Sequence, residues 1–151
     1  MYSKDELKKL KIEFWESFAA YCEVQPYLRR RRKMWTLYNT KVKGVELKFD
    51  ANRKGAYVIL EVNHRQEEER LEMYERLTWY KETLEKDFPD GLIWDCCFVR
   101  ETGNEVARIY VAKEGLDLHR REHWGDFFSF MARQMYLLER NFMSIAEYLR
   151  E

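Results

Sequence analysis

Two carboxylates in the first half of the chain have the chemistry of a metal site. Asp50 ends one predicted strand and Glu61 lies late on the next, so a hairpin could bring them together. Paired carboxylates hold Mg²⁺, which can activate a water molecule for phosphodiester hydrolysis. The position two residues after Glu61, where a nuclease would need a lysine, is Asn63, and Lys48 on the preceding strand is the evident substitute.

The same residues also have a non-catalytic interpretation, which the sequence favours. Asp50 is then a turn residue and Glu61 an exposed acid on a strand, because the acid-x-Lys pattern is incomplete at both. Asp50, Glu61 and Lys48 are therefore catalytic candidates, with Asp50 and Glu61 as Mg²⁺ ligands, only if the protein is an enzyme. The favoured interpretation expects no cofactor.

A basic run is the strongest local charge feature. It combines phosphate partners with an aromatic face that could stack on a base. Its members are Arg29, Arg30, Arg31, Arg32, Lys33 and Trp35, which predicts a nucleic-acid contact. The alternative is that the arginines pair with the acidic residues of a helix that begins near residue 66.

Histidine and cysteine residues are few, and they predict no metal centre. His119 and His123 have the four-residue spacing of zinc ligands on a helix, but a third ligand is not evident, so caps or surface residues are favoured. The cysteines are odd in number and two of them, Cys96 and Cys97, are adjacent. We expect buried, reduced thiols rather than disulfides.

Composition indicates one globular unit over residues 1–151. The chain is 46% hydrophobic and 36% charged, with only 6 Gly and 2 Pro, which excludes disorder and collagen-like repeats. Equal numbers of basic and acidic residues, 27 each, exclude a global charge excess that would drive it to a polyanion. No apolar run reaches the length of a membrane span, so a cytoplasmic location is expected.

Two long helices are predicted at the ends of the chain. Ser3 and Glu6 form a capping box that begins a helix over residues 4–23. A heptad-like stripe from Phe128 to Leu149 predicts a second helix over residues 122–149. The second helix has more apolar surface than one seam can bury, which predicts a homodimer formed through it.

Between these helices the pattern predicts a sheet and one more helix. Period-two alternation and apolar runs indicate strands at 34–38, 45–51, 56–62, 92–99 and 106–112, and a helix is predicted over 66–88. Gly55 is part of a predicted turn, where it is free to take a positive φ. The fold class is α+β, in the order α-β-β-β-α-β-β-α, with a five-stranded, mainly antiparallel sheet covered by long helices. The predicted core comprises Phe14, Phe18, Leu47, Phe49, Val58, Leu60, Leu77, Trp94, Phe98, Ile109, Met131, Met135, Leu138 and Phe142.

Three segments carry a resemblance to a known family. They are residues 38–45 (Tyr-Asn-Thr-Lys-Val-Lys-Gly-Val), the hairpin around residues 49–58, and the helix over residues 124–139. They resemble the bacterial domain-of-unknown-function family 4268, which occurs alone and within restriction-system-like proteins. This resemblance implies a context near DNA metabolism or defence.

The expected function follows from this context. We expect a non-catalytic interaction module with a nucleic-acid or protein partner. The order of elements through residue 98 is also that of restriction-endonuclease-like nucleases, so the alternative is an active or degenerate metal-dependent endonuclease that uses Asp50 and Glu61.

Overall fold

The fold is α+β, with one four-stranded antiparallel sheet in the part of the chain that the structure describes. A computed structural model describes residues 2–28 and 40–150. The strands are β1 (Val45–Ala51), β2 (Gly55–Val62), β3 (Ile93–Val99) and β4 (Glu105–Glu114), in the spatial order β1-β2-β4-β3. The helices are α1 (Lys4–Glu23), α2 (Glu67–Thr78), α3 (Lys81–Glu85) and α4 (Trp124–Leu149), and short 3₁₀ turns lie at Pro26–Leu28 and Arg121–His123.

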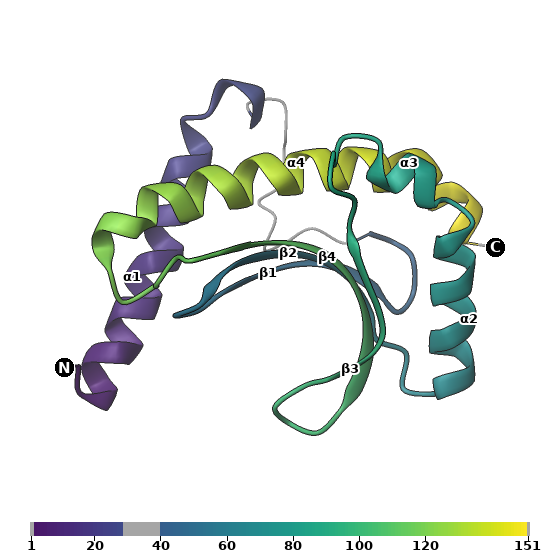
Figure 1. The fold of residues 1–151 in the computed structure, drawn as a ribbon, viewed down its shortest axis with the longest axis horizontal. Coiled ribbons are helices and arrows are strands. Elements are labelled where there is room, and N and C mark those ends of the chain that lie inside the picture. The colour runs from purple at the N-terminus through teal and green to yellow at the C-terminus, as the bar shows by residue number, and fades with distance from the viewer. Residues whose placement is uncertain (1, 29–39, 151) are drawn as a thin grey trace.

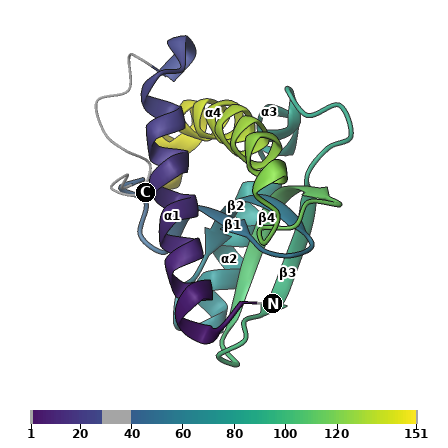
Figure 2. The same cartoon turned by 90° about the vertical axis from the view of Figure 1, so that its left-hand side faces the viewer.

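All the helices lie on the convex side of a strongly curved sheet. Figure 1 shows α4 along the sheet, α1 at one end and α2 at the other, with the concave side facing away from them. In Figure 2, α1 stands in front of the strands and α4 recedes above them. The main apolar core therefore fills the space between the helices and the convex side of the sheet.

Residue patterning explains most of this arrangement. The capping box of Ser3 and Glu6 is present and α1 begins at Lys4, as predicted. β2 is buried along nearly its whole length, which suits a central strand apolar on both faces. Most of the predicted core residues are buried, while Leu47, Phe49 and Trp94 are partly buried against the core. Phe98 is the exception, because it is half-buried and does not belong to this core.

Several predicted elements need correction. The helix predicted over 66–88 is divided into α2 and α3 by a break at Trp79 and Tyr80. The break lets α3 pack on α4, where Asn141 Nδ2 donates a hydrogen bond to the Leu84 carbonyl and Arg140 pairs with Asp87. The prediction of five strands is replaced by four among the described residues, and the strand predicted at 34–38 lies outside them. A restriction-endonuclease-like fold is not confirmed.

Gly55 has a different role from the one predicted. It is absent from the positive-φ glycines, so the turn does not need its conformational freedom. Instead, a Cβ at this position would lie 2.3 Å from the backbone oxygen of Lys113, because β4 approaches it closely. The glycine is thus required for strand packing rather than for turn geometry.

The surplus apolar surface of α4 is buried within the chain. Every seam residue from Phe128 to Leu149 is buried, Phe127 is fully buried, and Phe130 and Leu137 pack against the core. Among the described residues of α4, only Met143 and Tyr148 are exposed large apolar side chains. The apolar surplus of the 122–149 helix, which was the reason to predict a homodimer through it, is therefore buried within one chain. The dimer itself stays a prediction. No described helix has the length and apolar character that a membrane span requires.

Candidate functional site

The concave side of the sheet carries most of the polar side chains that could act together. We define the concave face by the side chains that alternate away from the helices. Its members are Glu46, Lys48 and Asp50 of β1, Gly55, Tyr57, Ile59 and Glu61 of β2, Ile93, Asp95 and Phe98 of β3, Arg100 just beyond it, and Val106, Arg108, Tyr110, Ala112 and Glu114 of β4. Cross-strand partners share a face, so the register alone assembles this set.

A buried glutamate lies at the centre of the concave face. Glu61 is 0% exposed although it is charged. Its Oε1 accepts hydrogen bonds from Lys48 Nζ at 2.9 Å, from Asn63 Nδ2 at 3.1 Å and from Arg100 Nη2. Arg108 Nε lies 3.7 Å from its Oε2. One carboxylate thus gathers cations from three strands or their ends, and we call Glu61, Lys48, Arg100 and Arg108 the ion cluster.

The environment of the ion cluster keeps Glu61 ionised. Burial by itself raises the pKa of this carboxyl, but hydrogen bonds from Lys48 and Asn63 and the charges of Lys48 and Arg100 outweigh it and lower the pKa below the ordinary 4.5. The Arg108 guanidinium carbon also lies over the Phe98 ring, 3.8 Å from its centroid. The cluster is therefore a charged structural centre that fixes the positions of three cations.

The register separates the two carboxylates proposed as metal ligands. Glu61 is opposite Glu46 on β1, whereas Asp50 is opposite Tyr57. Four residues of strand at about 3.3 Å each place them roughly 13 Å apart along the sheet. Lys48 Nζ lies 2.9 Å from Glu61 Oε1 and 3.3 Å from Glu46 Oε2. Within residues 2–28 and 40–150 there is no group of three or more His, Cys, Asp or Glu side chains that could hold a metal ion. This geometry does not support a shared Mg²⁺ ion.

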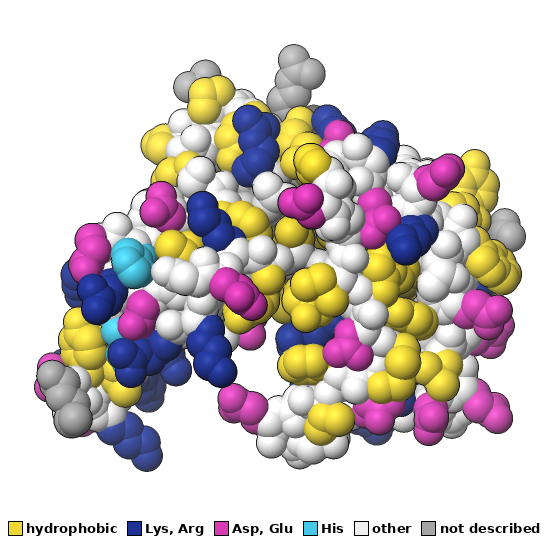
Figure 3. Space-filling model, viewed as in Figure 1, with side chains coloured by type: hydrophobic (Ala, Val, Ile, Leu, Met, Phe, Trp, Pro, Cys, Tyr) yellow, Lys and Arg dark blue, Asp and Glu magenta, His cyan; other side chains and the backbone are white. Residues whose placement is uncertain are grey.

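Two tyrosines form an aromatic pair on the concave face. Tyr57 and Tyr110 come from neighbouring strands, and their ring centroids lie 6.4 Å apart at an interplanar angle of 59°. Both side chains are half-buried. The exposed residues Arg53 and Lys54 follow β1 in the turn close to Tyr57. Figure 3 shows the concavity as a notch in the outline below the sheet, with both basic and acidic side chains along its border. The tyrosine pair therefore has cations on both sides along the sheet.

A β-bulge explains why Phe98 belongs to this face and not to the core. Asp95 is opposite Arg108, and Phe98 is opposite Val106, so Cys96 and Cys97 together face one residue of β4. The additional residue reverses the alternation, which would otherwise direct Phe98 towards the helices with Trp94. The alternation within β2 and β4 could have assigned Tyr57 and Tyr110 to the polar side of their strands. Arg100 and Arg108 reach Glu61 only because β4 pairs with both β2 and β3.

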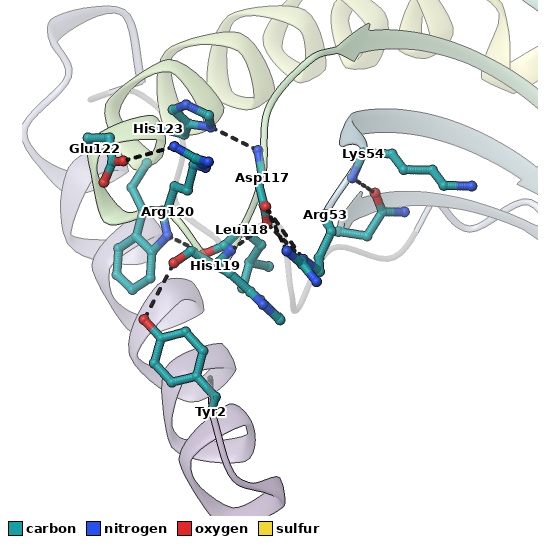
Figure 4. Close-up of polar contacts among 11 residues, drawn as sticks. Tyr2, Arg53, Lys54, Asp117, Leu118, His119, Arg120, Glu122 and His123 are labelled. Carbon is teal, nitrogen blue, oxygen red and sulfur yellow. Dashed lines mark hydrogen bonds and ion pairs between the residues drawn. The ribbon is translucent and has the colours of Figure 1, made fainter.

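The two histidines do not face a common ligand. The backbone N–H of Asp117 donates to His123 Nδ1 at 2.9 Å, whereas the His119 ring lies edge-on to Tyr2. Figure 4 shows the two rings on different sides of the segment, with the Asp117 carboxylate directed at Arg53. These contacts fix the loop before α4, which agrees with a structural role for both histidines.

The cysteines are free, as predicted, but they are not buried. Cys97 is exposed, and Cys22 and Cys96 are intermediate. Several effects raise the pKa of the Cys97 thiol to about 12. The largest is hydrogen bonding with Cys96, followed by desolvation, the charge of Cys96 and the Glu105 carboxylate.

The predicted nucleic-acid contact cannot be placed on this structure. Arg29, Arg30, Arg31, Arg32, Lys33 and Trp35 all lie outside the described residues. The acidic start of α2, which was their alternative partner, is described: Glu67, Glu68 and Glu69 are all exposed there. The basic run stays a prediction.

Comparison with known proteins identifies the family and no function. No curated protein and no solved structure matches the chain. The family model described as a domain of unknown function, DUF4268, matches residues 10–146, which begin within α1 and extend into the last turns of α4. The match therefore includes every strand of the sheet and its concave face. The chain belongs to the DUF4268 family.

Proposed function

We propose that the protein binds single-stranded nucleic acid on its concave face, as a non-catalytic module in nucleic-acid metabolism or defence. The observation that carries this proposal is a sheet face that no described helix covers and on which a tyrosine pair lies between two groups of cations. The context in defence is what the family resemblance implies.

Stacking is the first contribution to such binding. Tyr57 and Tyr110 are partly accessible, and the bases of a single strand stack on aromatic side chains with little dependence on sequence. Bases inside a duplex do not present their faces, so an open sheet with aromatic side chains suits an unpaired strand. The curvature of the sheet would keep the strand on the concave side, away from the helices.

Charge is the second contribution. The ion cluster places three cations beside the tyrosine pair, with Glu61 at its centre and Glu46 in contact with Lys48. On the other side, the Arg53 side chain is 68% exposed, although it also contacts Asp117. Glu46 and Asp50 are exposed on β1, which favours a path along β2, β4 and β3 rather than over the edge of β1.

Loss of the tyrosine rings should weaken binding strongly. Tyr57→Ala and Tyr110→Ala are each expected to raise the Kd for a fluorescein-labelled oligo(dT) or oligo(U) roughly 5-fold to 150-fold, because stacking contributes about 1–3 kcal/mol per base. Fluorescence anisotropy at fixed salt measures this change. Tyr148→Ala is the matched control, since this tyrosine is 59% exposed but lies on α4. Absence of binding, or equal effects of all three variants, would contradict the proposal and favour a protein partner.

The basic run can be tested in the same assay. If it contacts phosphates, changing Arg29, Arg30, Arg31 and Arg32 to glutamine should weaken binding and reduce the slope of log K against log salt by about 0.7 for each lost phosphate contact. Titrations at several salt concentrations measure the slope. An unchanged affinity and slope would exclude the run as a contact while leaving the concave face as the binding surface.

The alternative hypothesis, a metal-dependent endonuclease, predicts cleavage of DNA, which we do not expect. Asp50 and Glu61 are too far apart along the strands to share one ion, and Lys48 is engaged by Glu61. We therefore expect no cleavage of single- or double-stranded DNA with Mg²⁺ or Mn²⁺ in a gel assay. Cleavage that Asp50→Ala and Glu61→Ala each abolish in folded protein would establish the nuclease instead, and its loss in Lys48→Ala would identify the lysine as part of the site.

A further inference from the structure

The adjacent cysteines occupy an unusual position on an edge strand. Cys96 and Cys97 lie in the bulge of β3, where both oppose the single residue Ala107 of β4. In a regular strand, consecutive side chains point to opposite faces, but a bulge suspends this alternation. Cys97 is exposed and Cys96 is half-buried. Cys96 is also the largest of the influences that raise the pKa of the Cys97 thiol.

A direct disulfide does not suit this pair. Consecutive Cα atoms are about 3.8 Å apart, whereas the Cα atoms of disulfides usually lie about 4.4–6.8 Å apart. Both cysteines are free. The arrangement therefore favours two thiols that stay reduced. An atom bound between the two sulfurs would link them without the Cα separation that a direct S–S bond needs.

The surroundings limit which bridging atom could bind. A structural zinc site needs four ligands, and among the described residues there is no group of three or more side chains of the types that hold metal ions. The site offers two soft sulfur atoms and an exposed approach at Cys97. Val99, on the same edge strand, is 60% exposed and could contact an apolar substituent. A thiophilic centre that requires only two sulfur ligands fits this description.

We propose that Cys96 and Cys97 form a dithiol site that binds trivalent organoarsenicals. In the reaction, an arsonous acid R–As(OH)₂ forms two As–S bonds while two As–O bonds break. Each thiol gives up its proton, and two water molecules leave. Arsenic stays in the trivalent state, so neither an oxidant nor a reductant is required. This site is independent of the proposed nucleic-acid binding on the concave face.

Intact-protein mass spectrometry with phenylarsine oxide tests the site. The reduced wild-type protein is expected to take up one phenylarsenic group, to retain it in excess 2-mercaptoethanol, and to release it to 2,3-dimercaptopropanol. Cys96→Ser and Cys97→Ser should each lose the adduct in 2-mercaptoethanol, because one As–S bond cannot compete with excess monothiol. Cys22→Ser is the matched control and should behave as wild type.

Two results would overturn the proposal. One is a wild-type adduct that 2-mercaptoethanol removes, and the other is an adduct that either Cys96→Ser or Cys97→Ser retains. Peptide mapping of the wild-type adduct does not depend on the folding of any variant. It should place arsenic on the peptide containing residues 96 and 97, and a bridge involving Cys22 would also refute the assignment.

Discussion

Glu61→Ala is expected to lower the free energy of unfolding by about 3 kcal/mol at pH 7. Removing one member of a buried ion pair costs about 3–5 kcal/mol, because the remaining charge stays buried without a partner. Lys48 and Arg100 are partly exposed and can turn towards water, which favours the lower end of this range. The Arg108 side chain is only 17% exposed and is held against Phe98, so most of the cost arises there.

Urea denaturation measures this loss, and Glu46→Ala provides the matched control. Glu46 is directly opposite Glu61 on β1 and contacts the same lysine, but its side chain is 55% exposed. Exposed ion pairs contribute little, so this variant should remain close to wild type. Equal stability losses in the two variants would mean that burial of Glu61 has no special energetic role.

The same cluster predicts a dependence on pH with a defined sign. The folded state lowers the pKa of Glu61 below 4.5, so its ionisation stabilises the fold above that pH. This stabilisation is lost as the pH falls through the lowered pKa of the folded state. The difference in stability between wild type and Glu61→Gln should therefore be full at pH 7 and shrink below about pH 4.5. A difference that stays constant down to acid unfolding would contradict the ionised state of Glu61.

Phe14→Ala is expected to destabilise the protein by about 3–5 kcal/mol, the usual cost of removing a buried aromatic ring. Phe14 is 0% exposed and connects α1 to the start of α4. Its ring centroid lies 5.3 Å from those of Trp124 and Phe127 and 5.2 Å from that of Phe128. Its loss would remove the main contacts between the two terminal helices, and a domain is stable by only about 5–15 kcal/mol.

Urea titrations followed by tryptophan fluorescence test this prediction, because Trp124 reports directly on the cluster. Phe14→Leu should cost less, since it retains much of the buried apolar volume. Ile12→Ala is the control on the same helix, because Ile12 is 50% exposed. If Phe14→Ala is no more destabilising than Ile12→Ala, α1 is not held to α4 by this cluster.

Local signals in the sequence determined where most elements begin and end. The capping box of Ser3 and Glu6 acts within one helical turn, and it places the start of α1 correctly. The alternation in residues 45–51 and the apolar run in β2 identify a strand with one solvated face and a central strand. These signals succeed because each depends on residues only a few positions apart.

The candidate site was only partly visible at this level. The sequence draws attention to Glu61 and Lys48, but as a metal ligand and a catalytic substitute. Their observed partnership depends on Arg100 and Arg108, which lie 39 and 47 positions after Glu61 in the chain. Whether a charged residue on a strand is exposed or buried depends on partners from distant parts of the chain. The periodicity of a single strand carries no information about such partners.

Tertiary structure decided the remaining features through pairing and packing. The bulge at Cys96 and Cys97 reverses the face of Phe98, because a shift of one residue in register moves a side chain across the sheet. The break at Trp79 and Tyr80 lets α3 pack on α4. The apolar surplus of α4 is covered by α1, α3 and the sheet rather than requiring a second copy. Local sequence specifies the period of an element, whereas the partner that buries each face is set by contacts between segments distant in the chain.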